Sequence, residues 1–178
     1  MLFPKTILCF LAASATHCYA KAAFASTTAG LDTVQSHIEE LDALRTQIDS
    51  FNGGVTELWA LHSAGYRVLS GAGESRSMVE PMQNFTAEDE NIGRDHLIRF
   101  IRSYTLLLHS VSKKTYIIKN IPYGPEYMRQ IVDKARQEKD KWEEVLASKA
   151  SPESYQIFIP DFEKGEMEYN NVQKALLA

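Results

Sequence analysis

Residues 31–54, LDTVQSHIEELDALRTQIDSFNGG, decide the fold of this chain. The apolar side chains recur at steps of three or four residues, because they stand at Leu31, Val34, Ile38, Leu41, Leu44, Ile48 and Phe51. An α-helix turns once in about 3.6 residues, so this spacing places them on one helical face. Glycine is a common stop signal after a helix, and Gly53-Gly54 closes the stretch. The segment therefore predicts an amphipathic helix that needs partners to cover its apolar face.

A second amphipathic stretch begins at Val55 and carries apolar residues as far as Leu69. The small residues Gly71-Ala72-Gly73 then predict a helix stop and a flexible turn. Residues 74–83 are mostly polar and include Pro81, which indicates a loop or a short broken helix.

A long helix is expected after Thr86. Thr86 and Asp89 have the spacing of a capping box, in which two side chains bond the free amides at a helix start. Apolar residues then recur with helical period from Ile92 to Val111. Residues 115–118 favour a strand locally, but so short a patch without a partner strand does not outweigh the helical period.

Prolines divide the last third of the chain. The sequence IPYGP at 121–125 ends the long helix, and its second proline suits the first turn of a new helix. The apolar stripe of that helix occupies residues 128–146. A short segment is expected from Ser151 to Phe158, and Pro160 is expected to break it before a final helical segment.

These patterns define the fold class. No alternation of period two persists, and helices joined by short loops pack as antiparallel neighbours. The sequence predicts an all-α, single-domain bundle of four to five amphipathic helices over residues 31–178, preceded by a flexible N-terminal segment at 21–30.

Residues 1–20 have the features of a secretory signal peptide. Lys5 precedes an apolar run at 7–13, and small residues allow a cut after Ala20 or, as an alternative, after Ala25. The run is too short for a transmembrane segment, which needs roughly 20 apolar residues. The remaining alternative is an uncleaved anchor in the membrane interface. We expect the chain to be exported to the extracellular space.

Both cysteines, Cys9 and Cys18, lie inside this leader. An exported chain cut after Ala20 therefore has no disulfides and must be held together by packing alone.

Several function classes are disfavoured by the sequence. The formal net charge is −4 and no basic stripe stands out, so no nucleic acid partner is expected. None of the histidines outside the leader forms the pair with a glutamate that a zinc hydrolase helix needs, so no metal site is predicted. His62 is interpreted as a hydrogen-bonded residue of the core or its boundary. No catalytic residues and no cofactors are predicted.

One modification site is expected. Asn84-Phe85-Thr86 is the only N-glycosylation sequon, and it lies in a polar stretch before a helix. Thr86 also suits the N-cap, and both roles are compatible because the glycan uses the Asn84 side chain.

Helical bundles hold apolar ligands between their helices. The stripes supply seven candidate ligand-lining residues: Ile38, Leu41, Leu58, Ile101, Leu108, Ile131 and Val145. Each competes with a role as plain core, because cores have the same spacing. Four aromatic residues are alternatives for adsorption to a surface: Trp59, Tyr66, Tyr104 and Trp142.

The order of these features resembles a family. The chain resembles the fungal secreted hydrophobic surface-binding and cell wall galactomannoprotein family. The resemblance rests on Leu31-Asp32-Thr33-Val34 at a helix start and on the sequence IDSFNGG at 48–54. It also rests on a long middle helix and on an aromatic residue, Tyr169, in the closing helix. The chain departs from the mannoprotein branch because it has no Ser/Thr-rich tail or anchor signal.

The resemblance implies a non-enzymatic, all-α secreted protein that binds hydrophobic surfaces or takes up lipids such as fatty acids, with a cell-wall location as one alternative. The other function class that stays open is an effector or interaction protein that acts on a host protein or recruits a secreted hydrolase.

Overall fold

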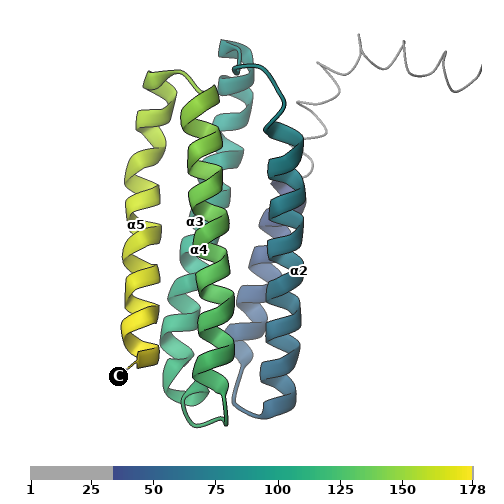
Figure 1. The fold of residues 1–178 in the computed structure, drawn as a ribbon, viewed down its shortest axis with the longest axis vertical. Helices are drawn as coiled ribbons and strands as arrows, with labels where there is room; N and C mark the ends of the chain where they lie inside the picture. The colour runs from purple at the N-terminus through teal and green to yellow at the C-terminus, as the bar shows by residue number, and fades with distance from the viewer. Residues whose placement is uncertain (1–33, 178) are drawn as a thin grey trace, which may run out of the picture.

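The computed structural model describes residues 34–177, which form an antiparallel bundle of five helices (Figure 1). The first helix covers the described residues 34–50. The other four are α2 (Val55–Val79), α3 (Ala87–Ile118), α4 (Gly124–Lys149) and α5 (Pro152–Leu177). No strand occurs among residues 34–177. The predicted all-α bundle of four to five helices is therefore confirmed.

The predictions for the leader, for the segment 21–30 and for both cysteines fall outside the described residues. Within residues 34–177, no helix is long and apolar enough to cross a bilayer.

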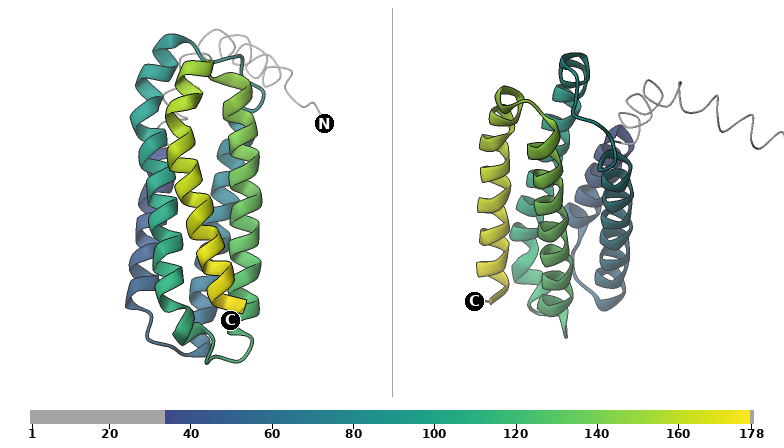
Figure 2. Two further views of the ribbon diagram at one scale, coloured as in Figure 1. Left: turned by 90° about the vertical axis from the view of Figure 1, so that its left-hand side faces the viewer. Right: turned by 45° about the horizontal axis from the view of Figure 1, so that its top comes forward.

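The helices run roughly alongside one another in the bundle (Figure 2). α3 packs against α4 and α5, and α4 also packs against α2 and α5. The first helix is tied to α2 by a bond between His37 and Ser75, and Lys114 on α3 donates to the carbonyl of Phe51 at its end. Each helix thus covers the apolar stripe of its neighbours.

The turn after the first helix forms as its glycines predict. Gly53 and Gly54 have φ angles of 114° and 110°, which side chains with a Cβ rarely adopt. Phe51 just before them is 2% exposed, so the turn also carries a core residue. The backbone can therefore reverse direction without moving Phe51 out of the core.

The predicted capping box opens α3. The backbone N–H of Asp89 donates to Thr86 Oγ1 at 3.2 Å, and the backbone N–H of Thr86 donates to Asp89 Oδ2 at 2.9 Å. Residues 115–118, which favour a strand locally, continue the helix. α4 begins as expected with a proline in its first turn.

α2 is longer than its sequence indicates. The predicted stop at Gly71-Ala72-Gly73 is wrong, because the helix continues to Val79 and only residues 80–86 form the connection to α3. A Cβ on Gly71 would lie 2.3 Å from the imidazole Cε1 of His37. The glycine therefore serves close packing between two helices instead of ending one.

Pro160 does not break the last part of the chain either, because α5 is continuous from Pro152 to Leu177. A proline inside a helix removes one backbone donor and leaves the carbonyl four residues earlier unpaired. That carbonyl belongs to Gln156, and both Pro160 and Gln156 are exposed. Water can therefore replace the missing bond, while Phe158 and Phe162 hold the helix to the core.

Candidate ligand-binding cavities

The core contains a row of apolar cavities. The central cavity has a volume of about 80 Å³ and is lined by residues of all five helices. Its apolar wall includes Leu41 and Leu44 from the first helix, Val68 from α2, Leu97, Ile101 and Leu107 from α3, Ile131 and Leu146 from α4, and Phe162 from α5. Close-packed cores hold few voids larger than a water molecule, so a cavity of this size is a distinct feature.

Two further cavities share walls with the central cavity. The lower cavity, of about 40 Å³, lies toward the 51–54 turn and shares Leu44, Gly65, Tyr104, Leu107, Ile131 and Ala135 with it. The upper cavity, of about 120 Å³, lies toward the 80–86 connection and shares Leu97, Trp142 and Leu146. Along α3 the row runs from Asp89 to Val111, or about 33 Å at a rise of 1.5 Å per residue.

Small residues create this space. Gly65, Ala135 and Gly165 line the central cavity where larger side chains would fill it. A Cβ on Gly65 would lie 3.2 Å from Cγ2 of Ile131, and one on Gly165 would lie 3.4 Å from Oγ1 of Thr105. At Gly65 helix α2 therefore approaches α4 closely, and at Gly165 helix α5 approaches α3 closely. The absence of side chains at these glycines also leaves part of the central cavity open.

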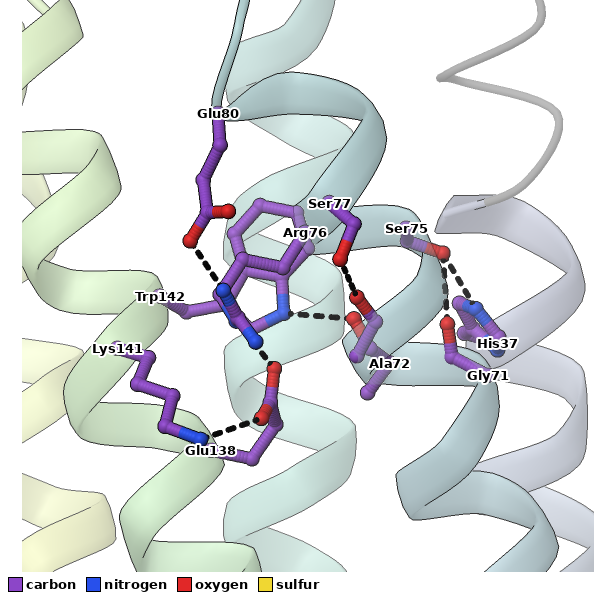
Figure 3. A network of polar contacts seen from close by, with 11 residues as sticks. His37, Gly71, Ala72, Ser75, Arg76, Ser77, Glu80, Glu138, Lys141 and Trp142 are labelled. Carbon is purple, nitrogen blue, oxygen red and sulfur yellow. Dashed lines mark hydrogen bonds and ion pairs between the residues drawn. The ribbon is translucent and has the colours of Figure 1, made fainter.

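Trp142 stands between the central and upper cavities. Its indole N–H donates to the carbonyl oxygen of Ala72 on α2 at 3.2 Å (Figure 3). In the same network Arg76 bonds Glu80 just after the end of α2 and reaches across to Glu138 on α4 with an Nε–Oε1 distance of 2.6 Å. This network fixes the α2–α4 contact and with it the position of the ring.

Most polar groups of the residues that line the central cavity form hydrogen bonds or ion pairs with other protein groups. Imidazole Nε2 of His37 is 2.7 Å from the hydroxyl of Ser75. Glu138 accepts from Arg76, and the ammonium of Lys139 lies 3.0 Å from carboxylate oxygens of Asp140 and Glu143. The wall is thus apolar toward the void, with its charges paired.

The phenol of Tyr104 is the exception. Its hydroxyl oxygen is buried and has no hydrogen-bond partner, although Tyr104 lines both the central and the lower cavity. Burial raises the pKa of this phenol well above its usual value, and the nearby carboxylates of Asp140 and Glu166 raise it further. The hydroxyl therefore stays protonated and is a free donor in the core.

The seven predicted lining residues lie in different places. Leu41, Ile101 and Ile131 line the central cavity, and Leu108 lines the lower one. Leu58 is buried beside a shallow surface hollow, whereas Ile38 and Val145 are buried and line none of these three cavities. Contact of any of them with a ligand stays a prediction.

Of the four aromatic residues predicted as alternatives for surface adsorption, two line the interior cavities and two lie nearer the outer surface. Tyr104 and Trp142 line the interior cavities. Trp59 is 58% exposed and stacks on His62, and Tyr66 packs on the other side of that imidazole. Only Trp59 and Tyr66 therefore stay candidates for an outer surface.

His62 differs from its interpretation. Its Nε2 is buried without a partner, so it is not hydrogen-bonded at that atom as expected. Its imidazole is instead packed among the rings of Trp59, Tyr66 and Tyr127, with centroid distances of 4.7 to 5.4 Å. Ring packing thus takes the place of the expected hydrogen bond.

Two further predictions concern the glycosylation site and metal binding. Asn84 is exposed in the connection between α2 and α3, so its side chain is accessible. Among residues 34–177 no group of three or more His, Cys, Asp or Glu side chains is arranged to hold a metal ion.

The protein is therefore an antiparallel all-α bundle with a row of internal apolar cavities. No protein-family model matches the sequence, and no curated protein matches it either. Similar solved structures include Afmp4p in complex with palmitic acid, with a TM-score of 0.78 and 9% identity, covering 84% of this chain and 99% of that chain. Ligand-binding domain 2 of the Penicillium marneffei MP1 protein, complexed with multiple arachidonic acids, has a TM-score of 0.73 and 10% identity, covering 82% and 92%.

Ligand-binding domain 1 of the same MP1 protein, complexed with arachidonic acids, is also similar, with a TM-score of 0.64 and 12% identity over 82% of this chain and 90% of that chain. At such low identities the likeness establishes a shared fold.

Proposed function

We propose that this chain is a non-enzymatic binder of lipids that takes up fatty acids in the row of cavities between its helices. The observation that carries the proposal is the central cavity, which is apolar, reaches all five helices and joins the upper and lower cavities through shared walls. The fold is shared with Afmp4p and the MP1 domains, whose solved structures hold palmitic or arachidonic acid. A long apolar chain matches the shape of such a row.

The energetics of packing support this role. A buried cavity costs about 24 cal/mol per Å³, so the 80 Å³ of the central cavity corresponds to about 2 kcal/mol of lost stability. Apolar cavities of this kind stay dry and accept apolar ligands. An acyl chain would restore the missing contacts, so ligand binding and stability are coupled.

Ala135 offers a direct test, because it lines the central and lower cavities from α4. Titration calorimetry with palmitate is expected to give a dissociation constant near or below 1 μM, about −8 kcal/mol. Ala135→Leu should fill the void, weaken uptake at least tenfold and raise the melting temperature. Ala147→Leu, at an exposed position of the same helix, should change neither. Lack of palmitate binding by the unchanged protein contradicts the proposal.

Secretion, glycosylation and a cell-wall role in a fungus belong to the same proposal. They rest on the leader-like residues 1–20, on the sequon at Asn84 and on the resemblance to the galactomannoprotein family. Expression of the full chain in a fungal host, followed by fractionation of medium, wall and cells, tests them together. Retention of the whole protein inside cells contradicts this part of the proposal.

A second candidate function is adsorption to a hydrophobic surface. One end of the bundle exposes Val55, Trp59 and Tyr123 with exposed fractions of 61%, 58% and 72%. Aromatic rings with one polar edge suit an interface between water and an apolar phase. Trp59→Ser should lower adsorption to hydrophobic beads while leaving palmitate binding unchanged. Equal adsorption of variant and parent excludes Trp59 from that role.

A further inference from the structure

The walls between the three cavities differ in the size of their residues. The central and lower cavities share six residues, and two of these, Gly65 and Ala135, are small. The central and upper cavities share only Leu97, Trp142 and Leu146, all of which are large. The row is therefore most open between its central and lower parts, and bulky side chains divide it below the upper cavity.

Trp142 is the member of this dividing wall that a hydrogen bond holds in place. Two bonds join α4 to α2, and their residues lie one turn apart on each helix: Arg76 donates to Glu138, and the indole of Trp142 donates to the carbonyl of Ala72 (Figure 3). The two leucines of the wall have no polar atom that could form such a bond. The indole can therefore leave its position only by giving up a bond that the leucines do not have.

We propose that Trp142 limits the length of the acyl chain that the bundle accepts. One chain occupies the central and lower cavities, and a longer chain is disfavoured because it must displace the indole and break its bond to Ala72. The inference rests on the proposed uptake of fatty acids and adds the residue that selects among them by length.

The length of the space below Trp142 sets the expected limit. From Leu97 in the dividing wall to Val111 in the lower cavity, α3 rises about 21 Å at 1.5 Å per residue. An extended chain advances roughly 3.5 Å per three bonds, so about 18 bonds fill that distance. An acid of roughly 18 carbons therefore fits below the indole, whereas one of roughly 24 carbons needs about 27 Å and reaches past it. The whole row of about 33 Å would hold the longer chain if the indole were absent.

The test compares two acids that differ only in length. Oleic acid is the shorter ligand and nervonic acid the longer one, and each has a single cis double bond. Displacement of the fluorescent parinaric acid gives both dissociation constants. The unchanged protein should bind nervonic acid at least roughly tenfold more weakly than oleic acid. Trp142→Leu should reduce this ratio to about threefold or less by strengthening the binding of nervonic acid, with oleic acid bound within about twofold of the parent.

Two further variants separate chain length from general damage to the fold. Trp59→Leu is the matched control, because it makes the same change at a tryptophan of α2 that is 58% exposed, and it should keep the ratio of the parent. Trp142→Phe keeps an aromatic ring in the wall but loses the indole N–H, so its ratio should lie between those of the parent and of Trp142→Leu. A loosened bundle would weaken both acids together and leave the ratio unchanged.

Three results overturn the inference while the proposed function stands. The first is equal binding of oleic and nervonic acid by the unchanged protein. The second is the ratio of the parent in both Trp142 variants, which means that another part of the wall sets the length. The third is a reduced ratio in Trp59→Leu as well. Failure of the unchanged protein to bind oleic acid or palmitate removes the proposed function and this inference together.

Discussion

The imidazole of His37 and the hydroxyl of Ser75 meet in the core between the first helix and α2, with 2.7 Å between Nε2 and Oγ. The Ser75 hydroxyl also lies 2.9 Å from the carbonyl oxygen of Gly71, and Nδ1 of the imidazole lies 3.1 Å from a carboxylate oxygen of Glu40. Both residues are less than one-tenth exposed. This pair therefore sets the register of the first helix against α2 beside the central cavity.

Loss of the Ser75 hydroxyl should destabilise the bundle. Ser75→Ala leaves Nε2 of His37 buried without a hydrogen-bond partner, which costs about 1–3 kcal/mol. Ser77 is the matched control, since its hydroxyl makes the same 2.9 Å bond to a carbonyl one turn earlier but is exposed and touches no histidine. Urea unfolding should give a clear loss for Ser75→Ala and a change within about 0.5 kcal/mol for Ser77→Ala. Equal losses would assign the effect to the local bond alone.

Two neighbouring glycines of α2 should respond to alanine with opposite signs. A Cβ on Gly71 would lie 2.3 Å from Cε1 of His37, so Gly71→Ala must displace the imidazole and break its bond to Ser75. A Cβ on Gly73 has its nearest neighbour at 3.8 Å. Gly73→Ala should therefore stabilise the helix by roughly 0.5–1 kcal/mol. Thermal melting of both variants decides this, and a gain of stability in Gly71→Ala would contradict the packing described for His37.

Some features of the fold can be predicted from the sequence, whereas others depend on contacts between helices. Local rules suffice for the capping box at Thr86 and Asp89 and for the turn at Gly53-Gly54, because their bonds and φ angles are local. Gly71 and Pro160 are read by the same rules as stops, yet both lie inside helices. Contacts with other helices outweigh a helix penalty of about 1 kcal/mol for glycine, and no pattern within a single stretch reports those contacts.

The candidate site has a similar limit. Apolar stripes identify the residues that face the interior, and Leu41, Ile101 and Ile131 do line the central cavity. Period alone cannot separate these residues from Val145, which is buried but lines none of the three cavities, because all of them have the same helical spacing. Tyrosine suits both a surface and an interior, and the position of Tyr104 on the apolar stripe between Ile92 and Val111 is the signal that favours the interior.

Asn84 is expected to carry an N-linked glycan when the full chain is made in a eukaryotic host. The side chain is exposed in the 80–86 connection, and Thr86 completes the sequon. Intact-mass measurement of the secreted protein should show a glycan-sized mass that disappears in Asn84→Gln. Since Asn84 lies outside the helices, the variant should melt within a few degrees of the parent after deglycosylation. Identical masses apart from the substitution would exclude modification at this position.

The stability of the bundle should fall on mild acidification because of His62. Burial lowers the pKa of this imidazole below its ordinary value of 6.5, and the positive charge of Lys134 lowers it further. Two rings from α2 and one from α4 surround the imidazole, namely Trp59, Tyr66 and Tyr127. As the pH falls below 6.5, the unfolded chain takes up a proton at His62 that the folded chain resists. Protonation therefore favours unfolding, and stability is greatest above that pH.

The variant His62→Phe isolates this effect, since it keeps an aromatic ring in the cluster but cannot be protonated. His37, His96 and His109 are present in both proteins, so the contributions of these other histidines cancel in the comparison. Urea unfolding from about pH 8 to about pH 5 should show the parent losing more stability than the variant, with the two curves parallel above pH 7. Curves that stay parallel down to pH 5 would mean that the folded bundle accepts the proton as readily as the unfolded chain does.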